Sequence, residues 1–124
     1  MTLLPGAPRA KQSWLEELQL WAVSNGASTW LIDLEPYVVC RVVGVVERLR
    51  IDPVNGWLQA TITDGTDEVV ARWFIRRPTP ELAAVPGRGV ALEGIALIDD
   101  DGELVLSEPV LQTLPFRLDR LMER

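Results

Sequence analysis

The fold of this chain is decided by residues 57–75, which read WLQATITDGTDEVVARWFI. Apolar and polar side chains alternate in residues 57–63 and again in residues 68–75, and an Asp-Gly-Thr sequence at 64–66 separates the two runs. Because successive side chains of a strand point to opposite faces, such alternation predicts half-buried strands. Two of them joined by a short Asp-Gly link are typical of a β-hairpin.

The two faces of this hairpin differ in character. Its inner face is expected to hold Leu58, Ala60, Ile62, Val69, Ala71 and Trp73, and its outer face Trp57, Gln59, Thr61, Thr63, Val70, Arg72 and Phe74. One face is almost wholly apolar and the other is mixed. This difference predicts a sheet that covers a core on one side only.

A long valine-rich run precedes the hairpin at residues 37–50, and Gly44 interrupts it. A glycine inside a strand often marks a bulge or a sharp bend, so we expect one bent strand here. Cys40, Val42 and Val46 would share its inner face, with Arg41, Val43 and Val45 on the other. Residues 52–56, Asp-Pro-Val-Asn-Gly, are the turn into the hairpin.

Two further strands follow the hairpin. Residues 78–86 begin and end with proline and break the sheet, with a short helical turn expected at 81–84. Residues 90–98 and 103–106 are then the fourth and fifth strands, joined by an acidic turn at 99–102. Whether the fifth strand continues past Pro109 to Leu114 is left open.

The N-terminal part is expected to be an arm followed by a helix. Ser13 and Glu16 have capping-box spacing, and Trp14, Leu18 and Trp21 recur at helical spacing. Asn-Gly at 25–26 is a plausible stop, which gives a helix over residues 13–24. Its apolar residues should pack onto the rest of the domain, a short turn should follow at 30–34, and residues 116–124 could form a short C-terminal helix.

The order is therefore helix, three strands, a short helical break and two strands. A bent first strand, a meander and an insertion before the fourth strand are the plan of a mostly β, five-stranded, partly open Greek-key barrel. The residues expected to line its core are Cys40, Val42, Val46, Leu58, Ala60, Ile62, Val69, Ala71, Val90, Leu92, Leu104 and Leu106.

Composition narrows the functional classes. Cys40 is the single cysteine and there is no histidine, so an intramolecular disulfide is impossible and zinc or haem binding is disfavoured. We expect no cofactor and no metal. The chain has no apolar run of about 18 residues and no signal-peptide pattern, so a cytoplasmic location is the default expectation.

No sequence motif marks a catalytic site. No pair of carboxylates has a spacing that identifies a general acid and base, and no serine lies in a nucleophile motif. No glycine-rich loop followed by lysine opens a helix, so nucleoside-triphosphate binding is not supported. The chain is expected to be non-enzymatic.

The ordered set of strands resembles the OB-fold nucleic-acid-binding family, in particular its tRNA-anticodon-binding-like branch, and also small stand-alone OB proteins of actinobacteria. The resemblance is carried by VCRVVGVV at 39–46, ATITDGT at 60–66, residues 69–74, PGRGVALEG at 86–94, and GELVL at 102–106 with Pro109. It covers residues 35–114 and implies a division into an N-terminal arm and helix (1–34), an OB-fold domain (35–115) and a short C-terminal helix (116–124).

The resemblance implies that single-stranded nucleic acid lies across the second and third strands. Bases would stack on aromatic rings, and arginines would follow the backbone. The residues implied as nucleic-acid-binding are Trp57, Gln59, Thr61, Arg72 and Phe74, with Arg76 and Arg77 extending the third strand and Arg48 and Arg50 bordering the first loop.

The two aromatic residues and the arginines at 72, 76 and 77 have structural alternatives. Phe74 could pack under a terminal helix, or Trp73 could be the exposed ring if the strand has the opposite phase. Trp57 either stacks on a base or closes one mouth of the barrel. Arg72, Arg76 and Arg77 could lie on a solvated edge or pair with the acidic turns, and not with phosphate.

Charge departs from what a nucleic-acid binder usually shows. The net charge is -6, and residues 36–115 hold seven Arg against twelve Asp and Glu. Phosphates approaching Asp99, Asp100, Asp101 and Glu103 would be repelled. Two hypotheses follow: a module for single-stranded DNA or RNA with little sequence preference, or an acidic module for protein interaction or self-assembly.

Overall fold

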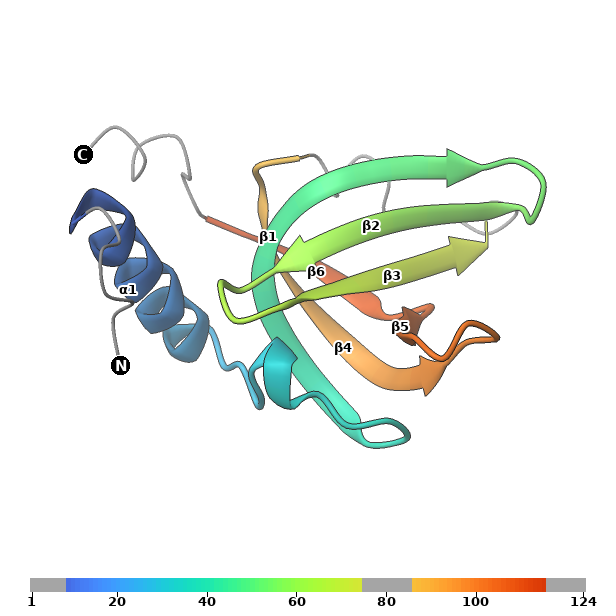
Figure 1. Cartoon of the computed structure of the whole chain (residues 1–124), viewed down its shortest axis with the longest axis horizontal. Helices are drawn as coiled ribbons and strands as arrows, with labels where there is room; N and C mark the ends of the chain where they lie inside the picture. Colours follow the sequence, from blue (N-terminus) through green and yellow to red (C-terminus); the bar gives the residue numbers. More distant parts are fainter. Residues whose placement is uncertain (1–8, 75–85, 116–124) are drawn as a thin grey trace.

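The computed structural model describes residues 9–74 and 86–115, with side chains from residue 15 onward. The elements are α1 (Arg9–Ser24), a 3-10 helix η1 (Leu31–Asp33), β1 (Val39–Asp52), β2 (Trp57–Thr63), β3 (Glu68–Phe74), β4 (Gly89–Ile98), β5 (Leu104–Ser107) and β6 (Val110–Leu114) (Figure 1). The helical turn expected at 81–84 and the C-terminal helix expected at 116–124 lie outside the described residues.

The strands close into a barrel. The hydrogen-bonded order is β1-β2-β3-β5-β4, and β4 pairs back to β1. The pairing of β3 with β5 is parallel, and the other pairings between the named strands are antiparallel. A sixth strand, β6, pairs with β4 outside this ring. The predicted mostly β, five-stranded Greek-key barrel with an N-terminal helix is confirmed.

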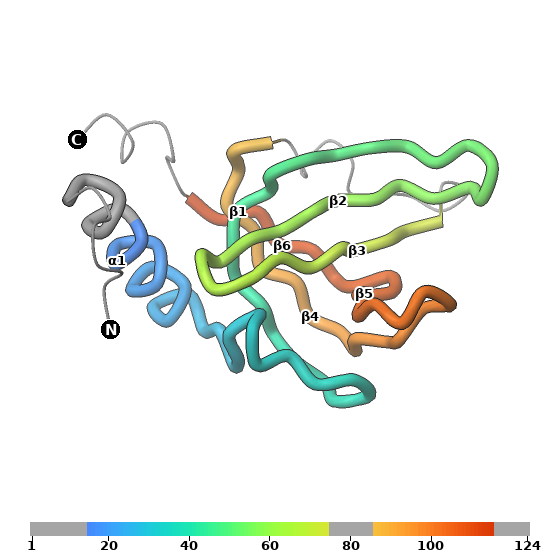
Figure 2. The backbone as a smooth tube through the Cα atoms, viewed as in Figure 1, coloured from blue at the N-terminus to red at the C-terminus, as the bar shows by residue number. Residues whose placement is uncertain are grey.

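The bend of β1 closes the ring. β1 pairs with β4 as far as Val45 and with β2 from Val45 onward, and Figure 2 shows how strongly its backbone curves. Gly44 precedes this change of partner. A Cβ there would overlap the carbonyl of Thr63 and lie 2.9 Å from Cγ2 of Ile62, so no larger residue fits. The bulge lies just beyond the bend, between Val46 and Arg48.

The predicted core is confirmed. The residues expected to line it are all buried in one cluster, except Leu104, which is partly buried against that cluster. The cluster also holds Leu31 from η1, together with Leu34, Trp73 and Ala96. The inner and outer phases predicted for β2 and β3 are therefore correct.

Several strand ends differ from the prediction by one or two residues. β1 begins at Val39 and not at residue 37, because Tyr37 has a φ of 65°, outside the range of a strand. The sequence left open whether the fifth strand continues to Leu114, and the structure shows a break between β5 and β6. Glu108, with a φ of 51°, and Pro109 interrupt it, and β6 is a separate element paired with β4.

Helix α1 begins earlier than predicted. It begins at Arg9, so Ser13 lies inside the helix and is not its N-cap. Arg, Ala, Lys and Gln at 9–12 all have high helix propensity, which extends the helix beyond the capping-box sequence. The predicted end at Asn25-Gly26 is correct. Gly26 has a φ of 86°, and the N–H groups of Gly26 and Ala27 close a Schellman motif on Val23 and Ala22.

The helix packs on the outside of the barrel wall. Ala22 is buried with Val43, Ala91 and Leu114, from the outer face of β1, β4 and β6, and Trp21 packs against this second cluster. Leu18 is fully buried. The expected packing of Leu18 and Trp21 is confirmed, whereas the side chain of Trp14 lies outside the described residues. No helix in the described ranges has the length and apolar character needed to cross a membrane.

Candidate nucleic-acid interface

The outer side of β1, β2 and β3 brings most of the predicted residues together. Cross-strand pairing forms three rows, namely Arg48–Thr61–Val70, Arg50–Gln59–Arg72 and Asp52–Trp57–Phe74. We call this surface the arginine–aromatic face and define it by Arg48, Arg50, Trp57, Gln59, Thr61, Arg72 and Phe74. The other two predicted residues, Arg76 and Arg77, lie outside the described residues.

The turn at the end of the β2–β3 hairpin fixes this register. Asp64 is buried, and its Oδ1 accepts a hydrogen bond of 2.9 Å from the backbone N–H of Thr66. Its Oδ2 accepts the N–H of Leu31, which ties η1 to the turn. Because a slip of one residue would exchange the two faces of both strands, this turn determines which side chains point outward.

An aromatic pair lies at one end of the face. The rings of Trp57 and Phe74 are stacked, with centroids 4.3 Å apart and planes inclined by 25°. Phe74 is 42% exposed, whereas Trp73 is 4% exposed and belongs to the core. The alternative in which Trp73 is the exposed ring is therefore wrong. Trp57 is not part of the core cluster, and its ring covers one face of the Phe74 ring.

Glu108 fixes the end of β3 that carries Phe74. Its carboxylate Oε1 accepts the backbone N–H of Phe74 at 2.8 Å, and its own N–H donates to the carbonyl of Arg72 at 2.7 Å. The sequence analysis did not identify Glu108. Nothing local marks it, because its position depends on the parallel pairing of β3 with β5.

Arg72 is engaged within the protein. Its Nη2 donates to Oδ2 of Asp99 at 3.2 Å, and its Cζ lies 5.9 Å from the centroid of the Trp57 ring. For Arg72, pairing with an acidic turn is therefore what the structure shows. The pKa of Asp99 is lowered, chiefly by the N–H of Glu103 and further by the N–H of Asp101 and by Arg72.

The other two arginines of the face are more available. Arg48 lies 3.7 Å from Oε2 of Glu68, and both side chains are largely exposed. Arg50 has no ion pair within the part of the chain that the structure describes. It is near Asp52, whose pKa is lowered chiefly by hydrogen bonds from Asn55 and, to a smaller extent, by the charge of Arg50. Exposed pairs such as Arg48–Glu68 contribute little to stability, so Arg48 can exchange its partner at low cost.

A hollow of about 400 Å³ adjoins the face. Val70 and Val105 are among its lining residues, together with Arg48 and Arg72. The carboxylates around it are Asp67, Glu68, Asp99, Asp101 and Glu103. This side of the face repels phosphate, so an anionic ligand is directed toward Arg50 and the aromatic pair.

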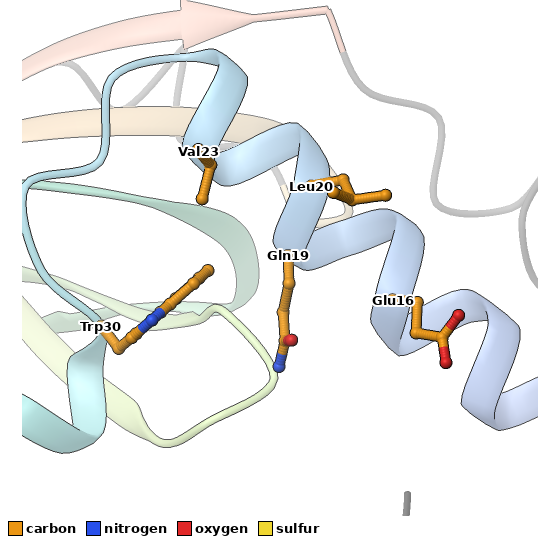
Figure 3. Close-up of a pocket in the computed structure, with 5 residues that line it drawn as sticks. All are labelled: Glu16, Gln19, Leu20, Val23 and Trp30. Atoms are coloured by element: carbon orange, nitrogen blue, oxygen red, sulfur yellow. The ribbon is translucent and has the colours of Figure 1, made fainter. Parts of the chain in front are cut away.

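A second hollow, of about 420 Å³, lies between α1 and Trp30 (Figure 3). The side chains of Val23 and Gln19 point from the helix to the side on which Trp30 lies. Leu20 and Glu16 complete the lining of the hollow. Leu20 is 69% exposed and Val23 59% exposed. The residues that line this apolar hollow precede those of the arginine–aromatic face in the sequence, and the two surfaces share no residue.

Within residues 9–74 and 86–115, no three carboxylates or cysteines are grouped as a metal site requires. In the acidic turn, Oδ1 of Asp99 accepts hydrogen bonds from the backbone N–H groups of Asp101 and Glu103.

Comparison with known proteins identifies the fold and not the family. No protein-family model and no curated protein matches the sequence. Among solved structures, OBody AM3L15 bound to hen egg-white lysozyme is similar with a TM-score of 0.57 and 15% identity, over 73% of this chain and 90% of that one. RecG bound to a three-way DNA junction is similar with a TM-score of 0.55 and 19% identity, over 71% of this chain. The barrel is OB-like. The chain spans 12% of the length of the RecG chain, and the anticodon-binding-like branch stays a prediction.

Proposed function

We propose that this chain is a non-enzymatic, cytoplasmic module that binds single-stranded DNA or RNA, with little sequence preference, on the arginine–aromatic face. The observation that carries the proposal is the exposed ring of Phe74, stacked on Trp57 and set one row from Arg50 and Arg72. A similar fold in RecG, whose structure contains a DNA junction, is compatible with it.

Phe74 supplies the base contact. Stacking of one base on one aromatic ring contributes about 1–3 kcal/mol and does not depend on base identity, because every base has a π face. Trp57 behind the ring and Glu108 on its backbone N–H hold the ring in place before a base arrives. Little ordering is then needed on binding, which favours affinity.

Arg50 supplies the first phosphate contact. It is in the middle row, beside Gln59, and no described carboxylate forms an ion pair with it. A phosphate next to a base on Phe74 would meet Arg50, which does not line the acidic hollow. With so few cationic contacts, affinity should be modest and should fall as salt rises.

Fluorescence anisotropy with labelled single-stranded DNA and RNA, at about 50 mM salt and above, tests the proposal. Phe74→Ala should weaken binding about tenfold or more and leave the salt slope unchanged, because stacking releases no counterions. Arg50→Gln should weaken binding less and flatten the slope. Tyr37→Ala is the matched control, since Tyr37 is an aromatic residue, 66% exposed, outside the face.

The proposal fails if the wild-type protein shows no saturable single-strand binding under these conditions. It also fails if Phe74→Ala binds as tightly as Tyr37→Ala, because the contact would then lie elsewhere.

The hollow beside α1 favours a second function, in protein interaction. Leu20 and Val23 are apolar and exposed, and Glu16 lies beside them, so the surface fits an amphipathic helix of a partner that carries basic residues. A synthetic helix with leucines on one face and lysines on the other should bind the wild-type protein and lose affinity for Leu20→Asp. Self-association in light scattering would instead assign the hollow to a second copy of the chain, and absence of both would refute this function.

A further inference from the structure

The two carboxylate oxygens of Asp99 have different partners. Oδ1 accepts the N–H groups of Asp101 and Glu103, both at 2.9 Å, and so organises the turn between β4 and β5. Oδ2 accepts a hydrogen bond from Nη2 of Arg72 at 3.2 Å. One oxygen therefore shapes the turn, and the other holds an arginine of the arginine–aromatic face.

Held in this way, Arg72 is incompletely satisfied. Its Nε is buried and has no hydrogen-bond partner among the described residues. A buried donor without an acceptor is costly, and the loss is greater for a charged group. A guanidinium presents its N–H groups as a fork that fits two oxygens of one phosphate. Arg72 can thus gain a contact by leaving Asp99 for a phosphate.

We propose that the Asp99 carboxylate binds Arg72 where a backbone phosphate would bind. When a single strand binds, its phosphate displaces this carboxylate from the guanidinium of Arg72. This inference rests on the proposed function and names the residue that limits affinity on the same face. Binding becomes an exchange of one anion for another on Arg72. A base can stack on Phe74 without this exchange, whereas a second phosphate contact requires it.

The exchange has two measurable consequences. Because the Arg72–Asp99 pair is partly exposed, breaking it weakens binding by up to about fivefold. The exchange also leaves the negative charge of Asp99 without a partner, so Asp99 takes up a cation from solution. This uptake offsets the cation that the phosphate releases when it binds Arg72. Arg72 therefore adds almost nothing to the salt slope in the wild-type protein and should add about 0.7 once Asp99 is neutral.

Asp99→Asn separates the two roles of this residue. The amide oxygen can still accept from Asp101 and Glu103, so the turn is retained, whereas the amide N–H₂ in place of Oδ2 cannot accept from Arg72. Asp100→Asn is the matched control. It removes the same charge from the same turn, and no ion pair or hydrogen bond of the Asp100 side chain is seen among the described residues.

We expect Asp99→Asn to tighten single-strand binding about fivefold in the anisotropy titration and to steepen the salt slope by about 0.7, with Asp100→Asn changing affinity less than twofold. In an Arg72→Gln background, Asp99→Asn should do no more than Asp100→Asn, because the arginine that it releases is absent.

Equal effects of Asp99→Asn and Asp100→Asn would overturn the inference and leave the proposed function standing, since simple charge repulsion would explain both. A full effect of Asp99→Asn in the Arg72→Gln background would overturn it as well. If neither the wild-type protein nor Asp99→Asn binds single strands, the proposed function fails and the inference fails with it.

Discussion

Replacing Asp64 by alanine should destabilise the domain much more than other changes of an acidic turn residue. Asp64 is 2% exposed, and its carboxylate accepts the backbone N–H groups of Leu31 and Thr66, each at 2.9 Å, and the hydroxyl of Thr66. The hydrogen bond of Leu31 is buried, so Asp64→Ala leaves that N–H without an acceptor.

The expected loss follows from these contacts. An orphaned buried donor costs about 1–3 kcal/mol, and a lost charge-assisted hydrogen bond to a partly buried group costs somewhat less. Together they predict a loss of about 2–4 kcal/mol in the free energy of unfolding for Asp64→Ala. Asp64→Asn retains one acceptor oxygen and should lose about half as much.

Urea denaturation followed by tryptophan fluorescence measures this loss. Asp67→Ala is the control, because Asp67 is exposed in the same turn and, among the described residues, its carboxylate accepts only the N–H of Glu68. It should cost less than about 0.5 kcal/mol. Equal losses for Asp64→Ala and Asp67→Ala would refute the idea that Asp64 joins η1 to the β2–β3 turn.

Three further predictions concern the barrel. Ile62→Ala should cost about 2–5 kcal/mol in urea denaturation, because Ile62 is fully buried, whereas the same change at Ile51, 64% exposed, should cost little. Gly44→Ala should cost about 1–3 kcal/mol or prevent folding, since its Cβ would overlap the carbonyl of Thr63, and a protein as stable as wild type would contradict the close approach of β1 and β2. The pKa of Glu47 is raised, first by burial and then by a hydrogen bond with Glu68. The stability that the protonated Glu47 contributes is therefore present at about pH 4 and is lost as the pH rises through this raised pKa. Glu47→Gln should therefore raise the Tm at pH 7 and not at pH 4, and an equal shift at both pH values would disprove this cause.

Alternation along single strands predicted much of the fold. It placed β2 at Trp57–Thr63 and assigned Ile62 and Trp73 to the inner side and Phe74 to the outer side, because the period of two is a local property. The same phase placed Arg72 and Phe74 on one face, and the antiparallel pairing of β1 with β2 placed Arg50 in the same row as Arg72, across Gln59.

Contacts between segments that are distant in the sequence could not be predicted in this way. The Glu108 carboxylate on the N–H of Phe74 depends on the parallel pairing of β3 with β5. The charge of the turn at 99–102 was recognised from the sequence, but only the structure shows that Asp99, and not its neighbours, holds Arg72. The start of α1 at Arg9 was missed because a capping-box sequence can occur inside a helix.

The central claim is that the arginine–aromatic face receives a single strand. An NMR titration of the ¹⁵N-labelled protein with a short single strand of deoxythymidines tests it most directly. We predict that backbone amide shifts concentrate on Arg50, Gln59, Arg72 and Phe74, and that the amides of Gln19, Leu20 and Val23 beside the second hollow do not change. Shifts confined to α1, or no saturable shifts on β1, β2 and β3, would contradict the account.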